Sequence, residues 1–288
     1  MIFKPRRSVA LATLACCLAT AVTTPLAVSP ASASEHHHRR GSDYLALGDS
    51  VPFGFNPLVP LGSDPSLYVG YPEVAAPGLH LALTNLSCPG QASGGFLSLD
   101  GADNGCFTFR AHFALHTSYD GAQLQAALDF LAGHPRTKVV TLMLGANDLF
   151  LCVNTTADRC SNPQELAATV ATLTRNLTTA LTAIRVVYHG RLVGVTYYTT
   201  DYAAPTDTVP IQAIDGALAD AVKAFHGVVA DGYAAFQKRS ARFRGDACAA
   251  GLLIRLPTGG CDIHPSAKGA RVLARIVTAA ARTRDDDR

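Results

Sequence analysis

Short apolar runs alternate with helix-length segments along most of the chain. The runs that we predict to be β-strands lie at residues 44–47, 80–87, 138–144, 191–197 and 252–256. The intervening patterns predict helices at residues 71–79, 124–133, 163–184, 211–239 and 266–281. The run at 138–144 is almost continuously apolar, as expected for a strand that is buried on both faces of a parallel sheet. Alternating strands and helices predict an α/β fold with a central parallel sheet covered on both faces.

Two long stretches interrupt this alternation and are rich in glycine, proline or serine. Residues 51–71 read as an irregular segment, and residues 88–119 as a loop with at most short helical turns. Long loops in compact domains are usually functional, so the first stretch could form one wall of a binding site. By contrast, Asn162, Pro163 and Glu165 form a helix-start signal, with Glu165 placed for a capping box.

Length and composition predict one domain over residues 43–283. The chain has 288 residues, of which 48% are hydrophobic, enough to bury one large core. Residues 34–42 read as a polar linker, including three adjacent histidines that we interpret as a solvated segment, and residues 284–288 as a polar tail. The net charge of +2 and the lack of a basic stripe argue against a nucleic-acid partner.

Residues 1–33 have the pattern of a secretory signal peptide. Basic residues are followed by an apolar stretch and then by Ala31-Ser-Ala33, so we predict cleavage after Ala33 and a secreted protein. The apolar stretch falls short of the ~20 residues that a membrane span needs, and no stable membrane insertion is expected. The pair Arg6-Arg7 leaves both the general and the twin-arginine export routes open.

Six cysteines remain after removal of Cys16 and Cys17 with the signal peptide. An even number in an exported chain predicts disulfides, although six cysteines allow fifteen pairings. We expect sequence neighbours to pair, each pair enclosing a loop, as Cys88–Cys106, Cys152–Cys160 and Cys248–Cys261. No Cys-x-x-Cys pair with zinc spacing occurs, so a metal site is the poorer alternative.

Four short blocks contain the candidate chemistry. They are Gly48-Asp-Ser50, Asn85 to Gly90, Gly145-Ala-Asn-Asp148 and Asp262-Ile-His264-Pro265. The first and third directly follow predicted strands, and in an open α/β sheet ligands bind beyond the carboxyl ends of the strands. Ser50 and Asn147 are therefore expected at one crevice, with Asp49 and Asp148 holding the loops by hydrogen bonds.

Together the four blocks resemble those of the SGNH, or GDSL-type, serine esterases and lipases, in particular secreted bacterial members. The resemblance covers residues 43–281 and implies a three-layer, flavodoxin-like SGNH-hydrolase fold. It further implies that Ser50 is the nucleophile, that His264 is the base, and that the backbone N–H groups of Ser50 and Gly90 and the Asn147 amide form the oxyanion hole. A monomer without a cofactor, acting on a small-molecule or lipid ester, is expected.

The group that orients His264 is the main departure from the family pattern. That pattern places a carboxylate three residues before the histidine, where this chain has Cys261, and Asp262 is only two residues ahead. Either the Asp262 carboxylate or the Cys261 backbone carbonyl could therefore hold the imidazole. We list Asp262 as catalytic because a nearby carboxylate stabilises the cationic form of the base.

Two classes of function are compatible with these residues. The first is an exported esterase or lipase, with carbohydrate deacetylase or phospholipase as substrate variants. The second is an extracellular binding protein that retains the fold without activity. The joint presence of Ser50, Gly90, Asn147 and His264 favours the enzyme, and the Gly-x-Ser-x-Gly elbow of the α/β-hydrolases is absent around Ser50.

Overall fold

The computed structural model describes residues 42–283. The predicted signal peptide at 1–33 and the polar tail at 284–288 lie outside the described residues, as does the predicted linker except for Ser42. Within residues 42–283, no helix is both long and apolar enough to span a membrane.

A five-stranded parallel sheet in the order β2-β1-β3-β4-β5 forms the centre of the molecule. The strands are β1 (Asp43–Gly48), β2 (Ala82–Asn85), β3 (Thr137–Met143), β4 (Arg191–Val195) and β5 (Val228–Ala230). This order is the flavodoxin-like one, and it confirms the predicted α/β class. Apolar runs form the inner strands because both faces are covered: Leu45, Leu47, Val140 and Leu142 have no exposed surface.

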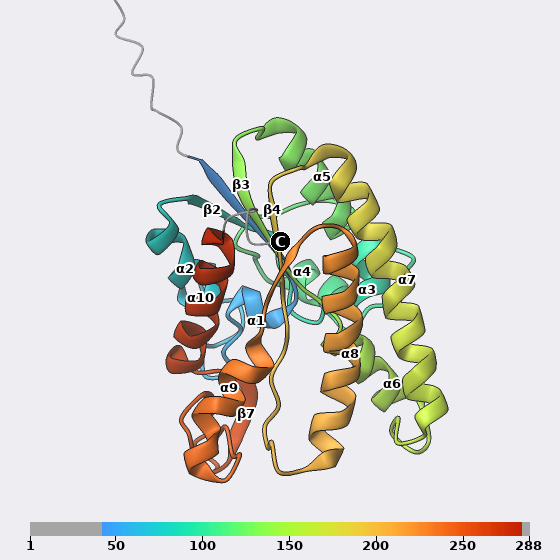
Figure 1. Ribbon diagram of the computed structural model, residues 1–288, viewed down its shortest axis with the longest axis vertical. Helices are drawn as coiled ribbons and strands as arrows, with labels where there is room; N and C mark the ends of the chain where they lie inside the picture. Colours follow the sequence, from blue (N-terminus) through green and yellow to red (C-terminus); the bar gives the residue numbers. More distant parts are fainter. Residues whose placement is uncertain (1–41, 284–288) are drawn as a thin grey trace, which may run out of the picture. The chain divides into compact units, whose positions relative to one another are not determined.

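Helices cover both faces of the sheet and complete the three layers (Figure 1). One side carries α2 (Tyr71–Leu79), α9 (Gly232–Ser240) and α10 (Ala267–Arg282), and the other carries α5 (Gln123–Gly133), α7 (Pro163–Val187) and α8 (Pro205–Ala224). One side of α7 is buried, with Leu173, Leu177, Leu181 and Ile184 at 0% exposure. Asn162 caps this helix by accepting a hydrogen bond from the Gln164 N–H (2.9 Å), but the predicted capping box with Glu165 is not formed.

Short helices occupy the stretches that were predicted to be irregular. They are α1 (Ser50–Phe53), η1 (Pro65–Leu67), α3 (Ser93–Leu97) and α4 (Cys106–His112). A further helix, α6 (Ala146–Thr155), starts directly after β3 and was not predicted, because the block at its start also fits a turn. A one-turn 3₁₀ helix, η2 (Ala241–Phe243), follows α9.

In the C-terminal third one prediction was wrong, and another was confirmed but outside the main sheet. The predicted helix at 211–239 is two helices separated by β5: α8 ends at Ala224, and Asp231 caps α9 by accepting a hydrogen bond from the Ala234 N–H (2.8 Å). A three-residue strand is too short to show a period of its own. The predicted strand at 252–256 is β6 (Leu253–Arg255), which pairs antiparallel with β7 (Cys261–Pro265) and lies outside the main sheet.

Candidate active site

Ser50 is the first residue of α1 and lies immediately beyond the carboxyl end of β1. The turn into it needs glycine, because Gly48 has φ +135° and a Cβ there would meet the Met143 carbonyl oxygen at 2.0 Å. The buried Gln123 side chain holds this turn, accepting from the Gly48 N–H (2.7 Å) and donating to the Gly48 carbonyl (2.9 Å). Asp49 caps α1 by accepting from the Val51 N–H. The serine therefore sits on a rigid connection.

The imidazole of His264 links Ser50 to Asp262. Nε2 lies 2.8 Å from Ser50 Oγ, and Nδ1 contacts Asp262 Oδ1. Because a carboxylate can only accept, Nδ1 carries the proton and Nε2 accepts the hydrogen bond that Ser50 Oγ donates. The same Asp262 oxygen accepts the His264 backbone N–H at 2.9 Å. The structure thus brings the carboxylate to His264 despite its spacing of two, and within residues 42–283 no hydrogen bond joins the Cys261 carbonyl to the ring.

The hydrogen bonds from His264 determine the direction in which the pKa of Asp262 is shifted. Partial burial acts to raise the pKa of this carboxyl, but the hydrogen bonds from the His264 ring and backbone N–H outweigh burial and lower the pKa below its usual value. Asp262 is therefore ionised at neutral pH.

The β6–β7 ribbon holds His264 from outside the main sheet. The Cys248–Cys261 disulfide ties the first residue of β7 to the preceding loop. Tyr198, which follows β4, donates its hydroxyl hydrogen bond to the Ile263 carbonyl at 2.9 Å. The ribbon that carries His264 is thus attached to the Cys248 loop by one covalent link and to the segment after β4 by one side-chain hydrogen bond.

The Asn147 amide is held at both of its ends. Its Oδ1 accepts a hydrogen bond from Asn104 Nδ2 (2.8 Å), and its Nδ2 donates to Asp49 Oδ2 (3.3 Å). An amide nitrogen carries two hydrogens, so one remains for a ligand. Asn104 also donates its backbone N–H to the Gly90 carbonyl (3.1 Å), which connects the second and third blocks. Within the described chain, the backbone N–H groups of Ser50 and Gly90 donate to no protein acceptor.

Gly90 is in the left-handed region at φ +85°, and a Cβ there would meet the Asn104 carbonyl oxygen at 2.6 Å. Only glycine fits without a shift of the backbone. Unlike Ser50, Asn147 and His264, it does not line the cleft described below.

The carboxyl of Asp49 is buried directly behind the serine. It accepts hydrogen bonds from the Val51 N–H (2.9 Å), from Asn147 and from the hydroxyl of Tyr197. Desolvation raises the pKa of Asp49 to about 6, against the opposing effects of the Tyr197 and Val51 hydrogen bonds and of the nearby His264. This carboxyl therefore changes its charge close to neutral pH.

Asp148, in the first turn of α6, performs a similar anchoring task. Its carboxylate accepts hydrogen bonds from the Ser93 backbone N–H (3.0 Å) and hydroxyl, and Asn176 Nδ2 donates to the same hydroxyl (2.8 Å). These contacts fasten α3 to α6 and α7, in agreement with the predicted holding role of Asp148.

A cleft of about 590 Å³ opens beside these groups and is lined by Ser50, Asn147 and His264. Its volume is within the range of small-molecule sites. Apolar side chains of α6, α7, α8 and β7 make up much of the remaining wall.

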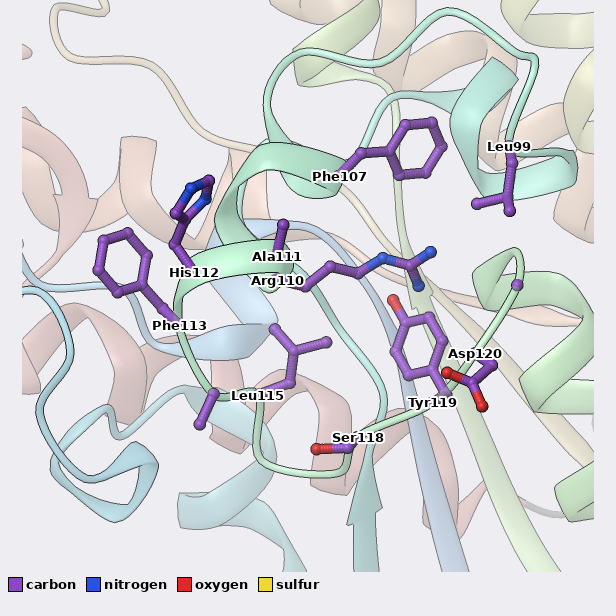
Figure 2. Close-up of a pocket in the computed structure, with 12 residues that line it drawn as sticks. Leu99, Phe107, Arg110, Ala111, His112, Phe113, Leu115, Ser118, Tyr119 and Asp120 are labelled. Carbon is purple, nitrogen blue, oxygen red and sulfur yellow. The ribbon is translucent and has the colours of Figure 1, made fainter.

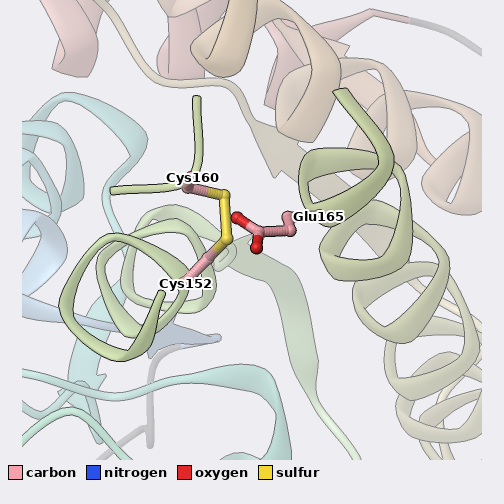
Figure 3. A group of neighbouring side chains, drawn as sticks. All are labelled: Cys152, Cys160 and Glu165. Atoms are coloured by element: carbon pink, nitrogen blue, oxygen red, sulfur yellow. A yellow bond between two sulfur atoms is a disulfide. The ribbon is translucent and has the colours of Figure 1, made fainter. Parts of the chain in front are cut away.

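The six cysteines within residues 42–283 are bonded in the expected neighbour pairs: Cys88–Cys106, Cys152–Cys160 and Cys248–Cys261. Among residues 42–283, one group could be considered as metal ligands, formed by Cys152, Cys160 and Glu165 (Figure 3). Its two sulfur atoms are bonded to each other, so neither is the thiolate that a zinc ion binds.

Three side chains that shape the site were not predicted from the sequence. Tyr197 could have been noticed, since it lies just beyond the carboxyl end of a strand, as Ser50 does. Asn104 and Gln123 reach the site from a loop and from the start of α5, and their own neighbours in sequence give no such signal.

Several solved structures share the fold at low sequence identity. An acetyl xylan esterase from Geobacillus stearothermophilus is 15% identical with a TM-score of 0.52, covering 84% of this chain and 94% of its own. A phospholipase A1 from Streptomyces albidoflavus is 18% identical with a TM-score of 0.52, covering 83% and 99%. An extracellular lipase from Streptomyces rimosus is 20% identical with a TM-score of 0.51, also covering 83% and 99%. A search of curated proteins finds no match.

The family is decided by a match over most of the sequence. The family model described as GDSL-like Lipase/Acylhydrolase matches residues 46–272, which includes all four blocks. The chain therefore belongs to the GDSL-like lipase/acylhydrolase family and is an ester hydrolase.

Proposed function

We propose that this protein is a secreted serine esterase or lipase that forms an acyl-enzyme on Ser50. The observation that carries the proposal is the continuous contact from Ser50 Oγ through the His264 ring to Asp262. Such an arrangement activates a hydroxyl that is a weak nucleophile on its own. The three disulfides and the signal-like N-terminus support export.

In the proposed reaction, Ser50 Oγ attacks the ester carbonyl while its proton passes to His264 Nε2. The oxyanion that forms is stabilised by the N–H groups of Ser50 and Gly90 and by Asn147 Nδ2. His264 then gives the proton to the departing alcohol, leaving an acyl group on Ser50. A water molecule, deprotonated by the same nitrogen, hydrolyses this ester and restores the serine. Asp262 stabilises the imidazolium that forms in each half.

Hydrolysis of p-nitrophenyl esters by the mature protein tests the proposal, with Ser50→Ala as the control. We expect turnover by the wild type and a loss of about 10⁶ in kcat for the variant. A fluorophosphonate probe should label Ser50 alone. Full activity of the folded Ser50→Ala variant, or labelling at another residue, would contradict the proposal.

A further inference from the structure

The cleft beside Ser50 extends away from the serine along helix α6, starting at Asn147. Asn147 lies in the first turn of α6, so the following turns of that helix carry the cleft wall away from the serine through Phe150 and Val153. At about 1.5 Å per residue, Val153 lies about 9 Å along the helix beyond Asn147. Val209 and Ile211 of α8 also line the cleft.

The wall of this cleft contains apolar side chains that the protein leaves without cover. Phe150, Val153 and Ile211 are only partly buried, and Val209 and Ile263 are 55% and 44% exposed. Exposed apolar surface that gathers in a concave site gains free energy when an apolar ligand removes it from water. An acetyl group on Ser50 would cover only the beginning of this wall.

The part of the cleft beyond α6 is rigidly built. Cys160 lines it and is bonded to Cys152, while Leu166 of α7 lines it as well. Arg159 and Cys160 adopt left-handed backbone conformations at φ 59° and 62°, which nonglycine residues rarely occupy. The Cys152–Cys160 disulfide therefore ties this part of the cleft lining to α6.

A second cavity, of about 700 Å³, provides a contrast (Figure 2). It is lined by α4 and the segment after it, including Arg110, His112, Tyr119 and Asp120. None of Ser50, Asn147 or His264 reaches it. Because this cavity is separate from the serine, it cannot hold an acyl chain that is bonded to Ser50.

We infer that the cleft between α6 and α8 is an acyl site for linear chains well beyond acetyl, and that Val153 and Ile211 determine the chain length accepted. The inference rests on the proposed function. It assigns this protein to medium- and long-chain acyl esters and away from acetylated carbohydrates, with the acyl carbonyl at Asn147 and the chain directed past Phe150.

The test is a series of p-nitrophenyl esters from acetate to dodecanoate, each used below its aggregation limit. Wild-type kcat/KM should rise with chain length, by up to about fourfold per buried methylene, until the chain fills the cleft. Val153→Phe should lower kcat/KM for dodecanoate at least tenfold and leave acetate within twofold. Leu99→Phe, which lies at the second cavity, is the matched control and should leave the whole profile unchanged.

A wild-type preference for acetate, or an equal effect of Val153→Phe on every ester, would overturn the inference while leaving Ser50-dependent hydrolysis intact. Hydrolysis that persists in Ser50→Ala would instead contradict the proposed function. If Val153→Phe fails to fold, Ile211→Trp narrows the same cleft from α8 and must give the same shift toward short esters. An unchanged profile in a folded Ile211→Trp variant would equally overturn the inference.

A separate set of contacts carries a second inference. Tyr197 is 4% exposed, and its hydroxyl donates to Asp49 Oδ2, the same oxygen that accepts Asn147 Nδ2. Asn104 holds the other end of that amide. The geometry points to Tyr197 as a positioning residue, which acts through Asp49 to aim the Asn147 amide at the oxyanion.

The charge on Asp49 gives this role a measurable signature. His264, Asp148 and Tyr197 act on this carboxyl, and the Tyr197 hydrogen bond lowers a pKa that burial raises. Removal of the hydroxyl therefore raises the pKa of Asp49 further. In the variant, Asp49 would then take up a proton, and so stop being the carboxylate that accepts from Asn147, at a higher pH than in the wild type.

Tyr197→Phe should lower kcat about tenfold, the effect of one hydrogen bond to a charged group, with KM within twofold. The acid limb of the kcat profile should move to higher pH. Tyr202→Phe, which removes a hydroxyl that donates to the Tyr233 carbonyl, is the control and should change neither. An unchanged kcat, an effect on KM alone, or a lower kcat with the wild-type pH profile would overturn the inference.

Discussion

The two halves of the site are built differently. Ser50 and Asn147 follow adjacent parallel strands of the main sheet and are surrounded by buried polar groups such as Gln123 and Asp49. His264 lies on a two-stranded ribbon outside that sheet, held by the Cys248–Cys261 disulfide and by Tyr198. The positions of Ser50 and Asn147 thus depend on the core, whereas the position of His264 depends on local links.

The two halves also differ in their electrostatics. Burial raises the pKa of Asp49, on the sheet side, to about 6. Partial burial also acts on Asp262, on the ribbon side, but hydrogen bonds from His264 lower its pKa below the usual value. The carboxyl on the sheet side therefore takes up a proton at a higher pH than usual, and the carboxyl on the ribbon side at a lower pH than usual.

The largest effect on the ribbon side is expected from Asp262→Asn. An amide in this position can hold the wrong tautomer of His264 and cannot stabilise the imidazolium, so kcat should fall by up to about 10⁴. Steady-state kinetics on a p-nitrophenyl ester measure it. Asp246→Asn, whose carboxylate also accepts a backbone N–H, is the control. A loss below tenfold would point to main-chain support of the base.

On the sheet side, Asn147→Ala should lower kcat by about 10²–10³ and leave KM nearly unchanged, because the amide acts on the oxyanion. Asn176→Ala removes an amide that only anchors Ser93, and serves as the control. If Asn147→Ala raised KM at constant kcat, the amide would be binding the ground state.

Removal of the ribbon disulfide should separate stability from catalysis. Cys248→Ala with Cys261→Ala should cost roughly 2–4 kcal/mol of unfolding free energy and also lower kcat, because the base loses a link. Cys152→Ala with Cys160→Ala should cost a similar amount of stability without lowering kcat for acetate. Thermal unfolding measures the stability of the two double variants, and steady-state kinetics below both unfolding midpoints measure their kcat. Equal losses of kcat in the two variants would show that catalysis does not depend on the ribbon disulfide in particular.

The smallest effects concern the pH dependence of stability. The stabilising contributions of Asp49 and Asp262 should change in opposite directions as the pH rises. Asp49 has a raised folded-state pKa, so its stabilising contribution is present below about pH 4 and lost as the pH rises through about 6. Asp262 has a lowered pKa, so its contribution is present above its unfolded-state pKa and lost as the pH falls through its folded-state pKa. Denaturant unfolding of Asp49→Asn and Asp262→Asn against wild type, from pH 3 to 8, measures both; slopes of the same sign would refute the contrast.

The sequence alone predicted the features that depend on local pattern. Apolar runs such as residues 138–144 became strands because both faces of the sheet exclude water. Helix α7 and its Asn162 cap were likewise predicted. The neighbour-paired disulfides needed only short loops, and the four blocks lie where strand ends and loops converge.

Tertiary structure decided whatever depends on contacts between distant segments. The two-residue spacing left the partner of His264 open, and only the fold of β7 brings the Asp262 carboxylate to Nδ1. Strand β5 exists because a vacant sheet edge accepts three residues that show no period. Asn104 and Tyr197 reach the site across the fold, since hydrogen bonds between residues far apart in the chain leave no periodic trace in either segment.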